Sequence, residues 1–179
     1  MAQKLNGLSD YIVINPGGNW PTKCWEPERY GELALRLMND GLPVAVTWGP
    51  GEERLVSRLV RSAGNGVREV ATSLEELVAL CEKARLFVGG DTGPMHFAAA
   101  IGTPIVSIFG PTSSDRNGPF RREDIVVERR LPCRPCYERD KCPLDHWQCM
   151  MDITVDHVYE ACRKRLLLAD AREPLQPAK

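Results

Sequence analysis

The chain has 179 residues, of which 43% are hydrophobic and 26% are charged, a profile typical of one folded domain with a sizeable core. Its net charge is −1, which excludes a global electrostatic field that would attract nucleic acid, so an anionic ligand must be met by a local site. No stretch approaches the ~20 apolar residues of a membrane span, and the first ten residues do not resemble a secretion signal. Seven cysteines suit a reducing compartment, and we expect a cytoplasmic protein.

Short apolar runs alternate with helical patterns from residue 11 to residue 109. The apolar runs predict strands at residues 11–15, 44–48, 67–70, 86–89 and 104–109. The intervening patterns predict helices from Pro27 to Gly41, over 52–63, from a Ser73 and Glu76 capping box to about 84, and in a small segment that ends at 100.

Strand and helix therefore alternate about five times with short connections. This pattern predicts an α/β fold of the Rossmann type, a doubly wound parallel sheet with helices on both faces. Ligands of such sheets bind beyond the carboxyl ends of the strands. We therefore expect the site in the loops that follow the strands.

The pattern loosens after residue 109. A further strand is expected at 125–128, and a Cys- and Pro-rich segment at 131–151 is expected to cover the surface. A closing amphipathic helix at about 155–168 would place its apolar face on Val158, Cys162, Leu166 and Leu167, followed by a frayed tail to Lys179. We treat residues 1–179 as a single domain.

The most informative stretch runs from Asp91 to His96, because it follows a strand and opens a helix. Backbone N–H groups near Thr92 and Gly93 would point outward at the positive end of the helix dipole, which favours a bound diphosphate. Asp91 would repel a phosphate and better suits sugar hydroxyls. An Asp or Thr that caps the helix without any ligand explains the same residues equally well.

Two further loops carry candidate ligand-binding residues. Lys23 lies in a Gly-rich loop after the first strand and would stabilise the charge that grows on a diphosphate leaving group, although a lone surface lysine is commoner. Glu52 and Glu53 follow the second strand, where a carboxylate often binds ribose hydroxyls, but acidic residues also stabilise the first turn of a helix. The P-loop and dinucleotide-binding fingerprints are both absent from the sequence.

Four cysteines, Cys133, Cys136, Cys142 and Cys149, lie in the Cys-rich segment with His146 nearby. Their C-x2-C-x5-C-x6-C spacing is compatible with zinc, an iron–sulfur cluster or a redox dithiol, although the second pair is not itself C-x2-C. Reduced thiols packed in a loop, or disulfides formed during handling, explain the spacing better. We predict no metal ligands and no required cofactor.

Four motifs in sequence order resemble the C-terminal domain of the lipopolysaccharide heptosyltransferase family. They are residues 15–18 (NPGG) with 23–25 (KCW), 48–53 (WGPGEE), 91–96 (DTGPMH) and 109–112 (FGPT), and the D-T-G-x-x-H stretch is the most specific. The resemblance extends from about residue 11 to residue 168. It implies one half of a GT-B glycosyltransferase, the half that binds the nucleotide-sugar donor.

The resemblance implies a role for each candidate residue toward an ADP-sugar donor. Lys23 would face the diphosphate beside Gly17, Gly18, Thr92 and Gly93, while Glu52 or Glu53 would bind the ribose. Thr72, Ser73 and Leu74 would border the adenine, Asp91 would hold heptose hydroxyls, and His96 would line the same pocket. Lys23 and Asp91 are the candidate catalytic residues. Gly17 and Gly18 replace hydroxyl residues of some members, and the loop is a residue longer before Lys23, which leaves its phosphate contacts open.

The resemblance also implies partners. Members transfer heptose from ADP-heptose to the lipopolysaccharide core with inversion and without an obligatory metal, at the cytoplasmic face of the inner membrane. An N-terminal domain binds the acceptor and supplies the general base, and we expect that domain to be absent here. The alternatives are a GT-B transferase or epimerase that uses a UDP-sugar, and a non-catalytic metal-binding or interaction module built on the Cys-rich segment.

Overall fold

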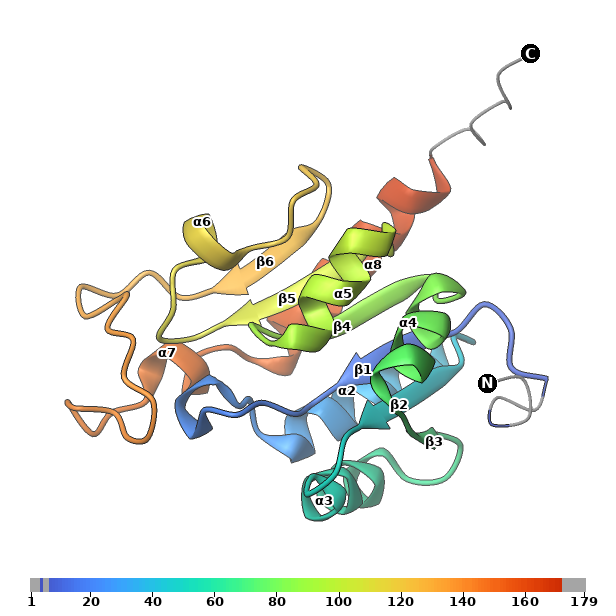
Figure 1. Cartoon of the computed structure of the whole chain (residues 1–179), viewed down its shortest axis with the longest axis horizontal. Helices are drawn as coiled ribbons and strands as arrows, with labels where there is room; N and C mark the ends of the chain where they lie inside the picture. The colour runs from blue at the N-terminus through green and yellow to red at the C-terminus, as the bar shows by residue number, and fades with distance from the viewer. Residues whose placement is uncertain (1–3, 5–6, 172–179) are drawn as a thin grey trace.

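The computed structural model describes Lys4 and residues 7–171. These residues contain a sheet of six strands in the order β3-β2-β1-β4-β5-β6 (Figure 1). All neighbouring strands run parallel. The strands are β1 (Ile12–Asn15), β2 (Val44–Trp48), β3 (Arg68–Ala71), β4 (Leu86–Gly90), β5 (Ile105–Phe109) and β6 (Ile125–Glu128). The predicted doubly wound parallel sheet is confirmed.

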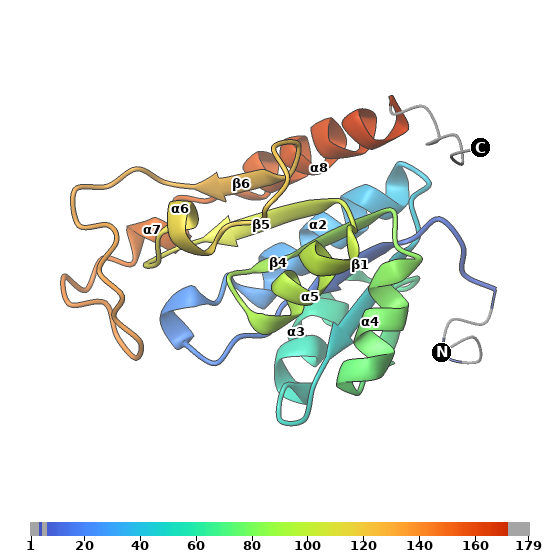
Figure 2. The ribbon, with the colours of Figure 1, turned by 45° about the horizontal axis from the view of Figure 1, so that its top comes forward.

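Helices cover both faces of the sheet, as Figures 1 and 2 show from two directions. The longer helices are α2 (Pro27–Asn39), α3 (Glu53–Ala63), α4 (Leu74–Glu82), α5 (Gly93–Ile101) and α8 (Val155–Asp170). Side chains of α2, α3 and α8 share one hydrophobic cluster, and side chains of α4 and α5 share another. Residues of β1 contribute to both clusters in alternation, because successive strand side chains point to opposite faces.

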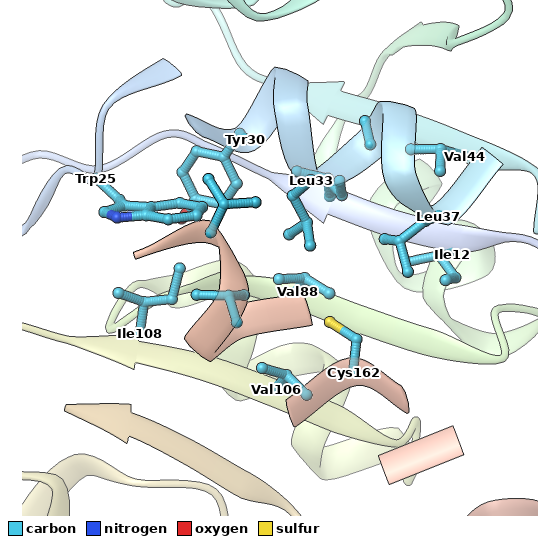
Figure 3. Packing of buried hydrophobic residues seen from close by; sticks show 14 of the residues in the cluster. Ile12, Trp25, Tyr30, Leu33, Leu37, Val44, Val88, Val106, Ile108 and Cys162 are labelled. Atoms are coloured by element: carbon cyan, nitrogen blue, oxygen red, sulfur yellow. The ribbon is translucent and has the colours of Figure 1, made fainter. Parts of the chain in front are cut away.

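The larger cluster joins α2 and α8 to the strands (Figure 3). Trp25 and Tyr30 pack edge to face, with ring centroids 4.8 Å apart, above Ile108. Helices α2 and α3 approach so closely that a Cβ added to Gly31 would lie 2.4 Å from the carbonyl oxygen of Leu59. Glycine is required there by packing rather than by backbone conformation.

A buried ion pair fixes the last helix to the sheet. Arg165 Nε of α8 donates to Asp124 Oδ1 at 2.9 Å, and the two side chains are 1% and 0% exposed. The same carboxylate oxygen accepts from the backbone N–H of Ile105 at the start of β5. Within the described residues, Asp124 Oδ2 and Arg165 Nη1 have no partner, so the pair is only partly satisfied.

Most predicted elements occur within one or two residues of their expected bounds. The capping box of α4 forms in both directions between Ser73 and Glu76. Leu167 was predicted on the apolar face of α8 but is 68% exposed. Arg165, two residues earlier in the same helix, is buried. The tail was predicted to fray after residue 168, but α8 extends to Asp170, and residues 172–179 lie outside the described part of the chain.

Between residues 7 and 171, the structure contains three short helical segments that were not predicted. They are η1 (Pro21–Lys23), α6 (Ser114–Asn117) and α7 (Gln148–Met151). All three lie beyond the carboxyl ends of the strands, in the loops after β1 and β5 and within the Cys-rich segment (Figure 1). Among the described residues, no helix is both long and apolar enough to span a membrane.

Candidate functional site

A cavity of about 730 Å³ opens at the carboxyl ends of the central strands. Strands β1 and β4 lie side by side there and are the point at which the winding of the sheet reverses, where ligands of open α/β sheets bind. Of the predicted site residues, these line the cavity: Gly17, Gly18, Lys23, Glu52, Thr72, Ser73, Leu74, Asp91, Thr92, Gly93 and His96. The structure therefore brings together predicted residues that follow four different strands, β1, β2, β3 and β4.

Lys23 and Asp91 are in direct contact although 68 residues separate them in the sequence. Lys23 Nζ donates to Asp91 Oδ2 at 2.7 Å and to the backbone carbonyl of Asp91 at 3.2 Å. These two contacts engage two of the three N–H donors of the ammonium group. The sequence placed both residues in the site, but it did not predict that they pair.

Asp91 is almost completely buried and its Oδ2 atom is fully engaged. Besides Lys23, the oxygen accepts from Thr112 Oγ1 at 2.7 Å and from Asn117 Nδ2 at 3.3 Å. Burial alone raises the pKa of a carboxyl group, but the hydrogen bonds from Lys23, Thr112 and Asn117 outweigh burial and hold the pKa of Asp91 below its usual value. Oδ1 is the carboxylate oxygen that remains for a ligand.

The N-terminus of α5 has no side-chain cap in the structure. Thr92 occupies the cap position with extended backbone, and its hydroxyl is directed to the carbonyl of Gly90 instead of a helix N–H group. The capping interpretation of Asp91 and Thr92 is therefore wrong. Nothing lies within 4 Å of the position of a Cβ on Gly93, so this helix end, with its partial positive charge, faces open space.

The structure distinguishes between the two glutamates. Glu52 Oε2 accepts from the backbone N–H of Gly49 at 2.9 Å, and a Cβ on Gly17 would lie 1.9 Å from Glu52 Oε1. Glu52 thus occupies the space left by Gly17 at the cavity wall. Glu53 is exposed, begins α3 and is not among the residues that line the cavity.

The loop after β3 forms the other end of the cavity. Thr72 Oγ1 lies 2.8 Å from Thr47 Oγ1, and the hydroxyl of Ser73 is engaged in capping α4. Leu74 is 55% exposed and offers an apolar surface for a flat ring. His96 lies on the opposite side, with its Nε2 atom 3.7 Å from Asp91 Oδ1 and its side chain 42% exposed.

Several cavity residues were not identified from the sequence. Asn15 is 3% exposed at the end of β1, and within the described residues its Oδ1 atom has no partner. The ring centroid of Trp20 lies 4.1 Å from Lys23 Nζ. Asn117 belongs to α6, a helix that was not predicted. Asn15 begins one of the motifs that carry the resemblance, whereas the signal for Trp20 and Asn117 is only their position after β1 and β5. A smaller cavity of about 380 Å³, beside β6, contains none of the predicted site residues.

The cysteines of the segment 131–151 are free thiols. Cys133 Sγ lies 3.8 Å from His146 Nε2, but no group of three His, Cys, Asp or Glu side chains in the part of the chain that the structure describes could hold a metal ion. This geometry does not favour the metal-binding alternative.

The model of glycosyltransferase family 9, the heptosyltransferases, matches residues 1–148. The chain is 34% identical over 130 residues to lipopolysaccharide heptosyltransferase 1 of Pseudomonas aeruginosa, a match that covers 72% of this chain and 37% of that protein.

Among solved structures, ADP-heptose lipopolysaccharide heptosyltransferase II of E. coli superposes with a TM-score of 0.80 at 26% identity, covering 95% of this chain and 52% of the other. The E. coli heptosyltransferase WaaC, solved with ADP, shares the fold, with a TM-score of 0.70 at 23% identity, and the match covers 92% of this chain and 48% of WaaC. The chain thus spans about half or less of the length of each of these proteins.

Proposed function

The chain belongs to glycosyltransferase family 9, the heptosyltransferases, and we propose that it is the domain that binds the donor in a GT-B enzyme of this family. The enzyme would transfer heptose from ADP-heptose to the lipopolysaccharide core with inversion. One observation carries the proposal: the Lys23–Asp91 pair lies beside the uncapped N-terminus of α5, inside the cavity at the switch point of the sheet.

The diphosphate would bind between Lys23 and the start of α5. The backbone N–H of Gly93 and the helix dipole favour an anion there, and the remaining N–H donor of Lys23 adds a charge-assisted hydrogen bond. Because Asp91 already neutralises Lys23 in part, the pair fixes the direction of the ammonium group more than it supplies net charge. Charge that develops on the leaving diphosphate would then be stabilised by groups already in place.

The rest of the donor would extend along the cavity on either side of the diphosphate. Glu52, Thr72, Ser73 and Leu74 line the cavity. Glu52 would accept from ribose hydroxyls, and the other three would border the adenine. On the other side, Asp91 Oδ1 and His96 would contact the heptose. Glu53 has no part in this arrangement.

The remaining parts of the reaction are assigned to a second domain. Relatives about twice as long as this chain would supply an N-terminal half that binds the lipopolysaccharide core and holds the general base. The complete enzyme would act in the cytoplasm, at the surface of the inner membrane, without a metal or other cofactor.

Calorimetric titration of the chain with ADP and with UDP tests the proposal. We expect ADP to bind and to raise the melting temperature, because a ligand specific to the native state stabilises it, while UDP binds more weakly. Lys23→Ala should reduce ADP affinity by about tenfold to a hundredfold, the effect of one charge-assisted hydrogen bond.

Lys164→Ala is the matched control, since Lys164 is an exposed lysine of α8, whose side chains pack on the sheet face opposite α4 and α5. Its ADP affinity should equal that of the wild type. A stronger response to UDP than to ADP would favour the UDP-sugar alternative, and equal losses in the two lysine variants would contradict the assigned role of Lys23.

A further inference from the structure

The turn that carries Lys23 rests on the Cys-rich segment 131–151. Thr22, in η1, is 3% exposed, and its Oγ1 lies 2.6 Å from the carbonyl oxygen of Glu138 and 3.0 Å from that of Arg139, so these two acceptors share its single hydroxyl proton. Its backbone N–H also donates to the carbonyl of Arg139 at 3.4 Å. A buried threonine thus connects two segments that are more than a hundred residues apart in the sequence.

Gly110, at the end of β5, leaves room for η1 because it has no side chain. A Cβ on Gly110, directly after β5, would lie 3.2 Å from the carbonyl oxygen of Thr22 and 2.4 Å from Met150 Sδ of α7. The turn η1 is therefore held between the end of the sheet and the Cys-rich segment. Figures 1 and 2 show the loop after β1 and the orange segment on the same side of the molecule, beyond the strand ends.

A second contact joins the same segments at the cavity. The indole ring of Trp20 has Lys23 Nζ at 4.1 Å and the guanidinium carbon of Arg139 at 5.2 Å from its centroid. Both are cation–π contacts, and Trp20 itself lines the cavity. Lys23 is thus held by Asp91 on one side and by Trp20 on the other, and both Trp20 and Thr22 are supported by residues 138–139.

We propose that Thr22 is a positioning residue for Lys23, and that the Cys-rich segment supports the donor site through it. The hydroxyl of Thr22 fixes η1 against the carbonyls of Glu138 and Arg139, and this fixes the neighbouring lysine where a diphosphate of the donor would bind. The proposal rests on the proposed function. It gives the Cys-rich segment a role that requires neither a metal nor a disulfide.

Calorimetry on Thr22→Val and Thr22→Ser, with ADP and adenosine as ligands, tests the proposal. Valine keeps the shape of threonine but cannot donate, so ADP affinity should fall by roughly fivefold to tenfold while adenosine affinity stays within about twofold. Serine retains the hydroxyl and should restore ADP affinity. A purely structural role would lower both affinities equally or neither.

Three outcomes are distinguishable. Wild-type chain that does not bind ADP contradicts the proposed function and this inference together. Wild-type binding of ADP, with Thr22→Val equally weakened toward ADP and adenosine or not weakened at all, overturns the inference alone. A selective loss of ADP affinity that serine restores supports both.

Arg139→Ala tests the same support without a substitution in the interior. Arg139 is exposed, so the variant should fold, and its ADP affinity should fall by about twofold to threefold through the loss of the contact with Trp20. Lys141→Ala removes an exposed cation of the same segment and should leave ADP affinity unchanged. Equal losses in the two variants would indicate general electrostatic attraction and overturn the positioning role.

Discussion

Gly17 and Glu52 show how the absence of one side chain shapes the candidate site. The Glu52 carboxylate occupies the volume that a Cβ on Gly17 would fill, and the backbone N–H of Gly49 fixes its direction. The glycine is required by this close approach and not by its own backbone conformation. A larger residue would displace a flexible carboxylate, which costs little stability but removes an acceptor for the ribose.

Gly17→Ala is therefore expected to lower ADP affinity by about tenfold, the effect of losing one hydrogen bond to a charged group. The melting temperature should change little. Titration with 2′,3′-dideoxy-ADP provides the comparison, because wild type and variant should bind a ligand without ribose hydroxyls equally. If the variant lost affinity for both nucleotides in the same proportion, the assignment of Glu52 to the ribose would be wrong.

Asp91 links the site to stability through its charge. Its folded-state pKa lies below the value of about 3.9 expected in the unfolded chain, so its stabilising contribution is fully present above that value. The contribution is lost as the pH falls through the folded-state pKa. Hydrogen bonds from Lys23, Thr112 and Asn117 are the cause of this lowering, which burial opposes.

Asp91→Asn should consequently reduce the free energy of unfolding by about 2 kcal/mol at pH 7, and the difference from wild type should shrink below about pH 4. Urea unfolding measured between pH 3 and pH 7 checks this. Asp115→Asn, at an exposed position of α6, is the control and should follow the wild-type profile. A difference that grows toward acidic pH would contradict the charged, hydrogen-bonded state of Asp91.

At the scale of the elements, α8 is fixed to the sheet by the buried pair of Arg165 and Asp124. The pair is an ionic contact within an otherwise apolar interface, and the carboxylate also holds the first N–H group of β5. Breaking a buried pair from one side leaves an uncompensated charge, which costs more than the pair itself contributes.

Arg165→Met should lower the free energy of unfolding by about 3 kcal/mol, because Asp124 remains buried without its cation. The double variant Arg165→Met/Asp124→Asn should recover part of this loss, as urea unfolding can show. Arg163→Met, at an exposed position of the same helix, is the control and is expected within about 0.5 kcal/mol of wild type. If Arg165→Met lowered the free energy of unfolding no more than Arg163→Met does, the buried pair would contribute little to stability.

The elements differ in how far the sequence predicts them. The strands and the longer helices follow from local hydrophobic periodicity and from caps such as Ser73, because these signals act within a few residues. The segments η1, α6 and α7 are three or four residues long and have no periodicity, so their form depends on tertiary contacts such as those of Thr22 with Glu138 and Arg139.

The same limit applies to the site. Loops after strands could be assigned to one edge of the sheet, so the grouping of Gly17, Lys23, Glu52 and Asp91 was predictable from the alternation of strand and helix. The pairing of Lys23 with Asp91 was not predictable, because the two residues lie in different loops and the form of η1 is set by tertiary contacts rather than by local periodicity. That Glu52 lines the cavity and Glu53 does not likewise depends on α3 beginning one residue later than predicted.

At the scale of the whole molecule, the cavity is open on the side where the loops of five strands end. The described residues provide groups for a nucleotide diphosphate and for one face of a sugar. The reaction that we propose also needs a general base and an acceptor site, which we assign to the N-terminal half of the longer relatives.

We predict that this chain alone binds ADP or ADP-heptose weakly and transfers no heptose. Incubation with ADP-heptose and a lipopolysaccharide core acceptor, followed by mass spectrometry of the acceptor, checks this. Supplying an N-terminal half from a relative should be required before product forms. Detectable transfer by the chain on its own would show that the base and the acceptor site lie within these 179 residues.

The central claim is that the Lys23–Asp91 pair and the start of α5 form a diphosphate site, and a crystal structure of the chain with ADP tests it most directly. We predict the diphosphate within hydrogen-bond distance of Lys23 Nζ and of the backbone N–H of Gly93, with the ribose toward Glu52. ADP bound elsewhere on the molecule, or with its phosphates directed away from Lys23, would contradict the account.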